Sequence, residues 1–330
     1  MGRFLEEEKQ KQYHYKVTSP LLSPGAKFDG NYKSKNRSFC LPVDFAAENL
    51  PTSIRENAIT FFKDHEIKWH DGQNGNPSNH LCDSQVCCVN FLFPFCNKPQ
   101  SLKILLRQVF PDIQEMLPVE NGMYVSFEWI GEKNYLGEKI RGTGKRSRGA
   151  NFTSADAIVS FTRSDTKKQV VLIEWKYTES YYPVPLMISK NGTSRVRIYQ
   201  NLFDETNSPL IRELIPNFES LFFEPFYQFM RQQFLAHEME KAHELGADMV
   251  SVLHIAPRHN HEFRRITSVI LSHLGDSSTG VWSSLVKDQR FKSVNTESLF
   301  GGYLPTDDPE LDENLKYLRM RYETLFEKQT

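Results

Sequence analysis

The segment 169–177, QVVLIEWKY, constrains the fold of this chain most strongly, because four consecutive apolar residues run directly into Glu174 and Lys176. A short apolar run of this kind predicts a buried strand. Side chains alternate along a strand, so Glu174 and Lys176 are expected on the same side of a sheet. Burying an unpaired carboxylate costs several kcal/mol, so a cation or a metal ion should lie beside Glu174. The sequence therefore predicts a polar site at the end of a buried strand.

A second carboxylate is expected next to this strand. The segment SADAIVSF (154–161) also reads as a strand, and the turn SDTKK joins it to 169–177 as a hairpin that carries Asp156. Two carboxylates on adjacent strands can hold one or two Mg²⁺ ions, with Mn²⁺ as an alternative. A lysine beside them can orient or deprotonate an attacking water. Asp156 and Glu174 are thus candidate metal ligands, and Lys176 is the candidate activator of water.

The remaining patterns predict an α/β protein with a mixed central sheet flanked by helices. Alternating apolar residues predict a further strand at 122–130, and ADMVSVLHIAP reads as a buried strand at 247–257. Helices are expected at 51–63, from Asp83 or Ser84 through Phe93, at 101–109, at 223–245 and at 309–327. We divide the chain into an irregular N-terminal arm with one helix (1–78), a core (79–260) and a C-terminal helical extension (261–330).

The spacing of an acidic residue, any residue and lysine is weak by itself. It also occurs at Glu7 and Lys9, at Glu66 and Lys68, and at Asp165 and Lys167, all in polar surroundings. The position of Glu174 and Lys176 behind a buried strand, with a partner aspartate, distinguishes them. The alternative is a structural ion pair, in which case Asp156→Ala lowers stability without abolishing any metal-dependent activity.

One pattern resembles the restriction-endonuclease-like PD-(D/E)XK superfamily: Asp156 is followed, after seventeen residues, by Glu174-Trp175-Lys176. Both segments lie on a hairpin within an αβββαβ order of elements. NFTSADAIVSF and VVLIEWKYTESY further resemble a bacterial group of uncharacterised nucleases related to restriction enzymes. The resemblance covers roughly residues 80–257. It implies Mg²⁺-dependent cleavage of DNA, with Asp156 and Glu174 as metal ligands and Lys176 activating water. Ala155 replaces the proline that precedes the aspartate in the motif, and many members of the superfamily lack that proline.

Members of this superfamily often add an upstream acidic residue, for which Glu128 is the first candidate and Glu138 the second. Glu128 could instead belong to a solvated face of its strand. The helix after the Glu174 strand carries a polar stripe at Tyr227, Gln228, Arg231 and Gln232, from which Gln228 and Arg231 are predicted to contact nucleic acid. Gln85 and Asn90, on the helix near 84–93, could reach the substrate, but a cap or a core hydrogen bond is an equal alternative.

Cations concentrate in the glycine-rich connection before the Asp156 strand. Its Lys139, Arg141, Lys145, Arg146 and Arg148 are predicted to bind phosphates. A weaker group follows the 247–257 strand, at Arg258, His259, Arg264 and Arg265. Ordinary solvated surface is the alternative for both groups. Since the net charge is −1, any contact with DNA must come from such local patches.

Several classes of protein are disfavoured. No stretch reaches the roughly 18 apolar residues of a membrane span, and the N-terminus is charged where a secretory signal is apolar, so we expect a cytoplasmic protein. Five cysteines, an odd number without a Cys-x-x-Cys pair, predict buried free thiols. Walker, dinucleotide-binding and His-Glu-x-x-His motifs are absent from the sequence.

Two rival functions remain open at this point. The first is a DNA-binding module whose active site has decayed, although the intact set of Asp156, Glu174 and Lys176 argues against it. The second is a nuclease that acts on RNA. Cleavage of both DNA strands often requires a dimer, so a homodimer is compatible with the resemblance, but the sequence identifies no dimer helix.

Overall fold

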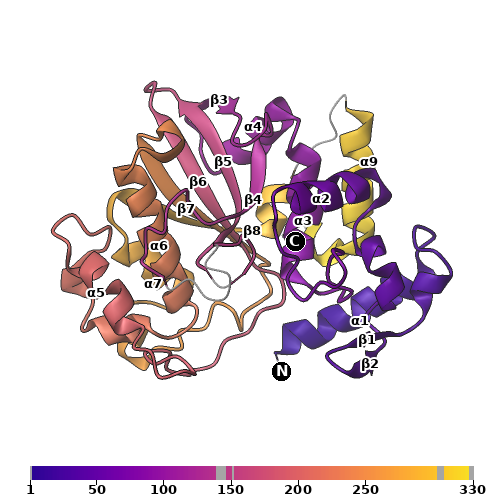
Figure 1. The fold of residues 1–330 in the computed structure, drawn as a ribbon, viewed down its shortest axis with the longest axis horizontal. Coiled ribbons are helices and arrows are strands. Elements are labelled where there is room, and N and C mark those ends of the chain that lie inside the picture. Colours follow the sequence, from indigo (N-terminus) through magenta and orange to yellow (C-terminus); the bar gives the residue numbers. More distant parts are fainter. Residues whose placement is uncertain (1, 139–145, 151, 303–307, 327–330) are drawn as a thin grey trace.

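The computed structural model describes residues 2–138, 146–150, 152–302 and 308–326, and its centre is a mixed sheet (Figure 1). The strands are β3 (Ile113–Leu117), β4 (Val125–Trp129), β5 (Ala155–Arg163), β6 (Lys168–Trp175), β7 (Met249–Ala256) and β8 (Phe291–Asn295). Their order is β3-β5-β6-β7-β8, and β4 also pairs with β5. β3, β4 and β6 run antiparallel to β5, whereas β7 and β8 continue parallel to β6. The predicted α/β class with a mixed sheet is confirmed.

Helices cover both faces of this sheet (Figure 1). One face packs against α2 (Thr52–Asp64), α3 (Ser84–Leu92), α4 (Pro99–Arg107), α8 (Thr296–Phe300) and α9 (Pro309–Arg321). The other packs against α5 (Val196–Asp204), α6 (Phe226–Lys241) and α7 (Ser278–Leu285). Alternate residues of β6 enter the two cores, Val171 and Ile173 on the first face and Val170 and Leu172 on the second. The predicted buried strand is therefore confirmed as β6, which ends at Trp175 rather than at Tyr177.

Most of the predicted helices are present with small shifts at their ends. α2, α3, α4 and α9 correspond to the helices expected at 51–63, near 84–93, at 101–109 and at 309–327. Asp83 caps α3 as expected, since its side chain accepts a hydrogen bond from the N–H of Val86 at 2.9 Å. α6 ends at Lys241 rather than at 245, because His243 and Leu245 adopt left-handed backbone conformations.

The prediction of an irregular arm is wrong for residues 3–18, which form α1 (Arg3–Thr18). This helix buries polar side chains as well as apolar ones, and Gln12 and Lys16 have no exposed surface. Its stability comes from tertiary hydrogen bonds, so no apolar periodicity indicates it in the sequence. The following segment is largely irregular, with a small hairpin of β1 (Gly30–Tyr32) and β2 (Lys35–Arg37).

Two strands of the central sheet were not predicted. β3 has the sequence IQEML and β8 has FKSVN, and both are short and partly polar because each forms one edge of the sheet. The C-terminal residues 261–330, expected to be helical, thus also contribute a strand to the sheet.

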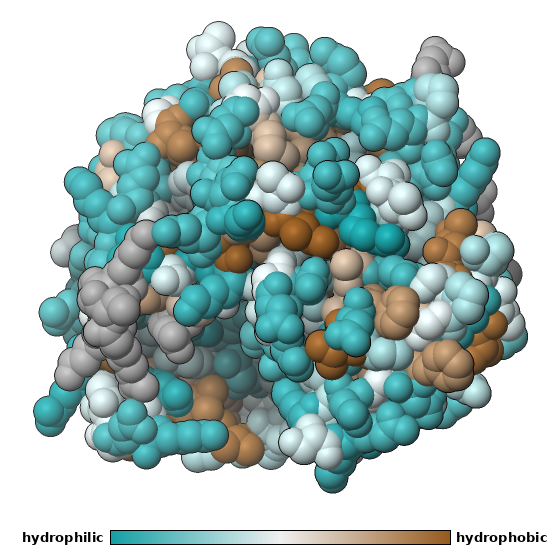
Figure 2. All heavy atoms as spheres, turned by 45° about the vertical axis from the view of Figure 1, so that its right-hand side comes forward, coloured by the Kyte–Doolittle hydropathy of each residue, from teal (hydrophilic) through white to brown (hydrophobic). Residues whose placement is uncertain are grey.

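The surface view in Figure 2 shows a face on which hydrophilic side chains predominate and apolar ones lie in scattered groups. Within the described ranges, none of the helices has the length and apolar character needed to cross a bilayer.

Candidate active site

Three of the predicted catalytic residues, Glu128, Asp156 and Glu174, occupy one row across the sheet. Phe127 and Trp129 pair with Ala157 and Ala155, so Glu128 lies opposite Asp156. The β5 and β6 register, in which Ala157 faces Ile173, places Asp156 opposite Glu174. Glu174 in turn pairs with His254 on β7. The row therefore brings the three predicted carboxylates onto neighbouring strands.

Backbone and side-chain contacts hold Asp156 and Glu174 in place. Asp156 Oδ2 accepts a hydrogen bond from the backbone N–H of Trp175 at 2.7 Å. Glu174, with 1% of its surface exposed, accepts a hydrogen bond at Oε2 from the side-chain amide of Gln232. The Trp175 N–H and the Gln232 amide thus orient the two carboxylates through one oxygen each, and they leave the other oxygen of each carboxylate to a different partner.

Lys176 directly follows Trp175, the last residue of β6, and points to the same side of the sheet as Glu174. Its Nζ is 2.5 Å from Glu174 Oε1, and 7% of its side chain is exposed. Its backbone N–H donates to the carbonyl of Ile255 at 2.8 Å, which extends the pairing with β7 by one residue. The expected placement of Glu174 and Lys176 on one face of the sheet is therefore observed.

Charge crowding shifts the acid–base behaviour of this group. Burial, and then the negative charge of Glu174, raise the pKa of Asp156 well above its ordinary value. Burial lowers the pKa of Lys176, but the negative charge of Glu174, with smaller contributions from Tyr181, Glu179 and Asp156, raises it well above its ordinary value. Lys176 is therefore an ammonium ion at neutral pH in the protein without bound ligands.

Glu128 is buried, so the expected alternative of a solvated glutamate does not hold. Its carboxylate accepts hydrogen bonds from Gln85 Nε2 at 2.6 Å and from Ser154 Oγ at 2.7 Å. Burial, with a further contribution from Glu174, raises the pKa of Glu128. Gln85 thus acts as a partner of Glu128, whereas Asn90 makes core hydrogen bonds to Asn49 and Tyr322.

Glu138 lies beside a different part of the site. It accepts hydrogen bonds from the backbone and hydroxyl of Thr153 at 2.8 and 2.6 Å and from the hydroxyl of Tyr199 at 2.8 Å. These contacts fasten the chain just before β5 to α5. Glu138 therefore supports the strand that carries Asp156, and Glu128 is the acidic residue that joins the row.

The polar stripe of α6 faces the site, and its closest member was not singled out in the sequence. Gln232 contacts Glu174 directly, and its amide also donates to the carbonyl of Ser154 at 3.3 Å. Gln228 accepts from the hydroxyl of Tyr181 at 3.2 Å, and Arg231 donates to Thr153 Oγ1 at 3.1 Å. The polar stripe pointed to Gln232 as one of its members. The sequence does not show how the helix is rotated about its axis, and this rotation decides which member contacts Glu174.

The predicted cationic patch is only partly within the described residues, which exclude Lys139, Arg141 and Lys145. Arg148 pairs with Glu120 at 2.9 Å and donates to the carbonyl of Phe127 at 3.0 Å, with 13% of its side chain exposed. Arg146 donates to the carbonyl of Ile130, and its Nε is buried without a hydrogen-bond partner. Both line a cavity of about 550 Å³ beside the end of β4.

The weaker cationic group after β7 is largely occupied by contacts within the protein. Arg264 donates to the carbonyl of Pro257 at 2.6 Å and to the side chain of Asn295 at 2.5 Å. The side chain of Arg258 donates to Ser298 at 3.2 Å.

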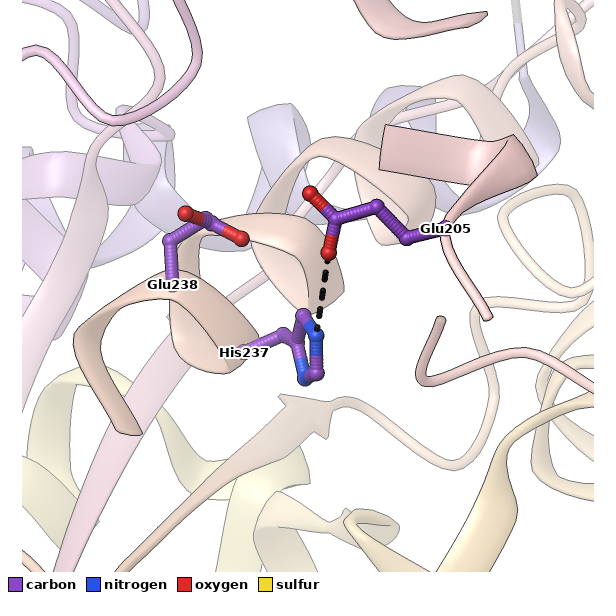
Figure 3. A group of neighbouring side chains, drawn as sticks. All are labelled: Glu205, His237 and Glu238. Atoms are coloured by element: carbon purple, nitrogen blue, oxygen red, sulfur yellow. Dashed lines mark ion pairs between the residues drawn. The ribbon is translucent and has the colours of Figure 1, made fainter. Parts of the chain in front are cut away.

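A second cluster of titratable residues lies away from the row, at Glu205, His237 and Glu238 (Figure 3). One ligand atom from each comes within 4.8 Å of the others, and Glu205 points toward the ring of His237. Lys241 Nζ lies 2.9 Å from Glu205 and 2.6 Å from Glu238, so one ammonium group already pairs with both carboxylates. We interpret this cluster as a surface ion-pair network.

Residues of the row can hold a divalent cation. The carboxylate of Glu174 is buried, the half-buried carboxylate of Asp156 lies opposite it, and Lys176 is the cation that contacts Glu174. Among the described residues, Glu128, Asp156 and Glu174 do not bring their ligand atoms within 4.8 Å of one another as a trio. The donor set that fits a hard cation most directly is therefore the pair Asp156 and Glu174, with Glu128 further along the row.

The predicted free thiols are confirmed, since Cys40, Cys82, Cys87, Cys88 and Cys96 are all buried and unbridged.

Comparison with known proteins gives one result. The model of a family described as restriction endonuclease associating with ARP matches residues 9–323. No curated protein and no solved structure matches the chain.

Proposed function

Because the chain belongs to the family of restriction endonucleases associating with ARP, we propose that it is a Mg²⁺-dependent endonuclease that hydrolyses phosphodiester bonds of DNA. The observation that carries this proposal is the placement of Asp156, Glu174 and Lys176 together at the end of one hairpin. A structural ion pair needs only one carboxylate for each lysine. Asp156 is a second, half-buried carboxylate whose raised pKa shows that its charge is unfavourable here, and a bound cation would favour its ionised form.

We further propose that the core is of the PD-(D/E)XK type. The order β4, β5, β6, α6 and β7 supports an αβββαβ arrangement, with α3 or α4 as the first helix. In this arrangement the carboxylates come from adjacent antiparallel strands, and α6 contributes Gln232 from the face that they share.

The proposed metal ligands are Asp156 and Glu174, with Mn²⁺ as an alternative to Mg²⁺. A bound Mg²⁺ would supply positive charge that polarises the phosphodiester and stabilises the leaving oxygen. Trp175 N–H and Gln232 hold one oxygen of each carboxylate, which fixes the direction in which the other oxygen points.

Lys176 is proposed to orient the attacking water molecule. Its raised pKa keeps Nζ protonated, so it donates hydrogen bonds to the water or to a phosphate oxygen and orients them. Glu128, hydrogen-bonded to Gln85 and Ser154, lies at the next position of the row, where it can accept a hydrogen bond from a water molecule.

DNA is proposed to contact the protein through the cationic connection 139–149 and through Gln228 and Arg231 of α6. Gln228 and Arg231 lie beside residues of the site, Tyr181 and Thr153. Among the described residues of the connection, Arg146 has a side-chain donor, Nε, without a hydrogen-bond partner within the protein. Arg148 is held by Glu120 and by the backbone, so we assign it to the support of β4 rather than to phosphate binding.

The proposal is tested by incubating the purified protein with plasmid DNA, single-stranded DNA and RNA in the presence of Mg²⁺, Mn²⁺ or EDTA. We expect cleavage of DNA with either metal and none with EDTA. Cleavage of RNA alone would replace DNA as the substrate, and retention of duplex without cutting would indicate a binding module.

The family description also names an association with ARP, and we extend this association to the present chain. The same cleavage assay with ARP added therefore separates a protein that requires its partner from one that lacks the activity.

A further inference from the structure

α1 reaches from the N-terminus to the residue that follows Lys176. The hydroxyl of Tyr177 donates to Glu8 Oε2 at 2.6 Å and accepts from Gln12 Nε2 at 3.1 Å. All three side chains are buried, with at most 1% of their surface exposed. The segment beyond β6 and the first helix, far apart in sequence, are thus joined by a buried pair of hydrogen bonds.

α9 and the short helix after it complete this network. Arg321 donates to Gln12 Oε1 at 3.1 Å, and Gln12 donates to the carbonyl of Arg321 at 3.2 Å. Thr324 donates to Glu8 Oε1 at 3.1 Å. The residues that hold Tyr177 are therefore held themselves by the C-terminal helices, and a buried network of this kind stays rigid while every member has a partner.

The hydrogen bonds of Tyr177 to α1 are important because backbone pairing with β7 ends at Lys176. Lys176 makes the last backbone bond to β7, through Ile255. The N–H of Tyr177 turns instead to Ser84 Oγ at 3.2 Å and to Glu179 at 2.8 Å, and its carbonyl accepts from Asn260 at 3.1 Å. The backbone next to Lys176 is thus positioned by side chains rather than by a strand pair.

We infer that Glu8 and Gln12 of α1 are positioning residues, which hold Tyr177 and thereby the ammonium group of Lys176 against Glu174. This inference rests on the proposed nuclease function. A displacement of about 1 Å of a reacting group can cost 100-fold in rate. The helix whose sequence shows no apolar periodicity is therefore assigned a role in the reaction geometry.

Tyr177→Phe and Glu8→Ala test the inference, and the chain offers a matched control for each. Tyr317→Phe also removes a hydroxyl from the buried network, at its bond of 2.6 Å to Arg321, but does so away from Lys176. Glu7→Ala removes the neighbouring carboxylate of α1, which is exposed and pairs with Arg3. Tyr317→Phe therefore controls for a loss of stability, and Glu7→Ala controls for a change in α1 itself. A loss of activity confined to Tyr177→Phe and Glu8→Ala then reports the positioning of Lys176.

We expect kcat for DNA cleavage to fall by about threefold to tenfold in Tyr177→Phe and Glu8→Ala, with KM changed by less than about twofold. Tyr317→Phe should lower the Tm comparably but leave kcat within about twofold of the wild type. An unchanged kcat in Tyr177→Phe, or an equal loss in Tyr317→Phe, would overturn the inference.

Hydrogen–deuterium exchange makes the test independent of cleavage. Backbone amides of residues 174–180 should exchange at least about fivefold faster in Tyr177→Phe than in the wild type, and should keep their wild-type rate in Tyr317→Phe. Unchanged exchange in Tyr177→Phe overturns the inference even if the wild type cleaves DNA. Faster exchange in a protein that cleaves nothing even when ARP is added supports the anchoring and refutes the proposed function instead.

Discussion

The backbone N–H of Trp175 donates to Asp156 Oδ2 at 2.7 Å, so the residue between Glu174 and Lys176 fixes the aspartate on the neighbouring strand. This single bond couples the three residues of the proposed site. It also helps the half-buried Asp156 to lie opposite the buried Glu174, because the backbone satisfies one oxygen of Asp156 and a bound cation would balance its charge when it ionises.

Asp156→Asn should therefore abolish cleavage and, in EDTA, raise the free energy of unfolding by about 1 kcal/mol. Burial and Glu174 raise the pKa of Asp156 above its value in the unfolded chain, so its ionisation opposes folding increasingly as the pH rises above the unfolded pKa. Asparagine keeps an oxygen for the Trp175 N–H without that charge.

Thermal unfolding with EDTA and with Mg²⁺ checks this prediction. Mg²⁺ should stabilise the wild type but not the variant. A less stable variant that still cuts DNA would instead favour a structural ion pair.

Gln232→Ala should lower kcat by about 10-fold to 100-fold, because the amide of Gln232 orients Glu174. Gln233→Ala is the matched control, since Gln233 is also buried, lies next along α6 and lines a cavity with His237 and Lys241 instead. Steady-state cleavage kinetics of the two variants make the comparison. Equal rates in both would show that Glu174 does not depend on α6.

The two described arginines of the connection should behave differently. Arg146→Ala should reduce the slope of log K against log salt concentration for DNA binding by about 0.9, the value for one phosphate contact. Arg148→Ala should leave that slope unchanged but lower the free energy of unfolding by about 1 to 3 kcal/mol, because it removes the partner of Glu120 and a bond to Phe127. Binding titrations at several salt concentrations measure the two slopes. A reduced slope for Arg148→Ala with an unchanged slope for Arg146→Ala would assign the phosphate contact to Arg148 instead.

His80 should make the protein sensitive to mild acid. Burial lowers the pKa of His80 from 6.5 to about 4, and its Nδ1 accepts the N–H of Cys82 at 3.1 Å. The unfolded chain thus binds a proton that the folded protein excludes, so stability falls as the pH drops from about 6.5 to about 4, by up to about 3 kcal/mol.

Denaturant titrations of the wild type and of His80→Asn across this pH range measure the effect. The variant should show a shallower decline in the free energy of unfolding between pH 6.5 and 4. Parallel curves would assign the acid sensitivity to other groups.

The sequence predicted the hairpin from two short apolar segments joined by a turn, and α6 from apolar residues that repeat with the period of a helix. Asp156, Glu174 and Lys176 could be found in this way, since each stands where such a pattern ends. Their opposition across β5 and β6 follows from the hairpin register.

What could not be predicted depends on contacts between distant segments. α1 is held by Tyr177 and Arg321, more than 150 residues away, so its own sequence resembles a polar arm. Glu128 is buried by Gln85 and Ser154, and Arg148 is occupied by Glu120, although both residues look solvent-facing in their local sequence. Burial of a polar side chain is a property of its partners, which a local pattern does not contain.

The most direct test of the proposed site compares the wild type with Lys176→Ala for cleavage of plasmid and single-stranded DNA, alongside calorimetric titration of Mg²⁺ into both proteins. We predict that the variant still binds Mg²⁺ through Asp156 and Glu174 but loses cleavage by at least about 100-fold. A variant that cuts DNA at the wild-type rate would contradict the assignment of Lys176 and of the site built around it.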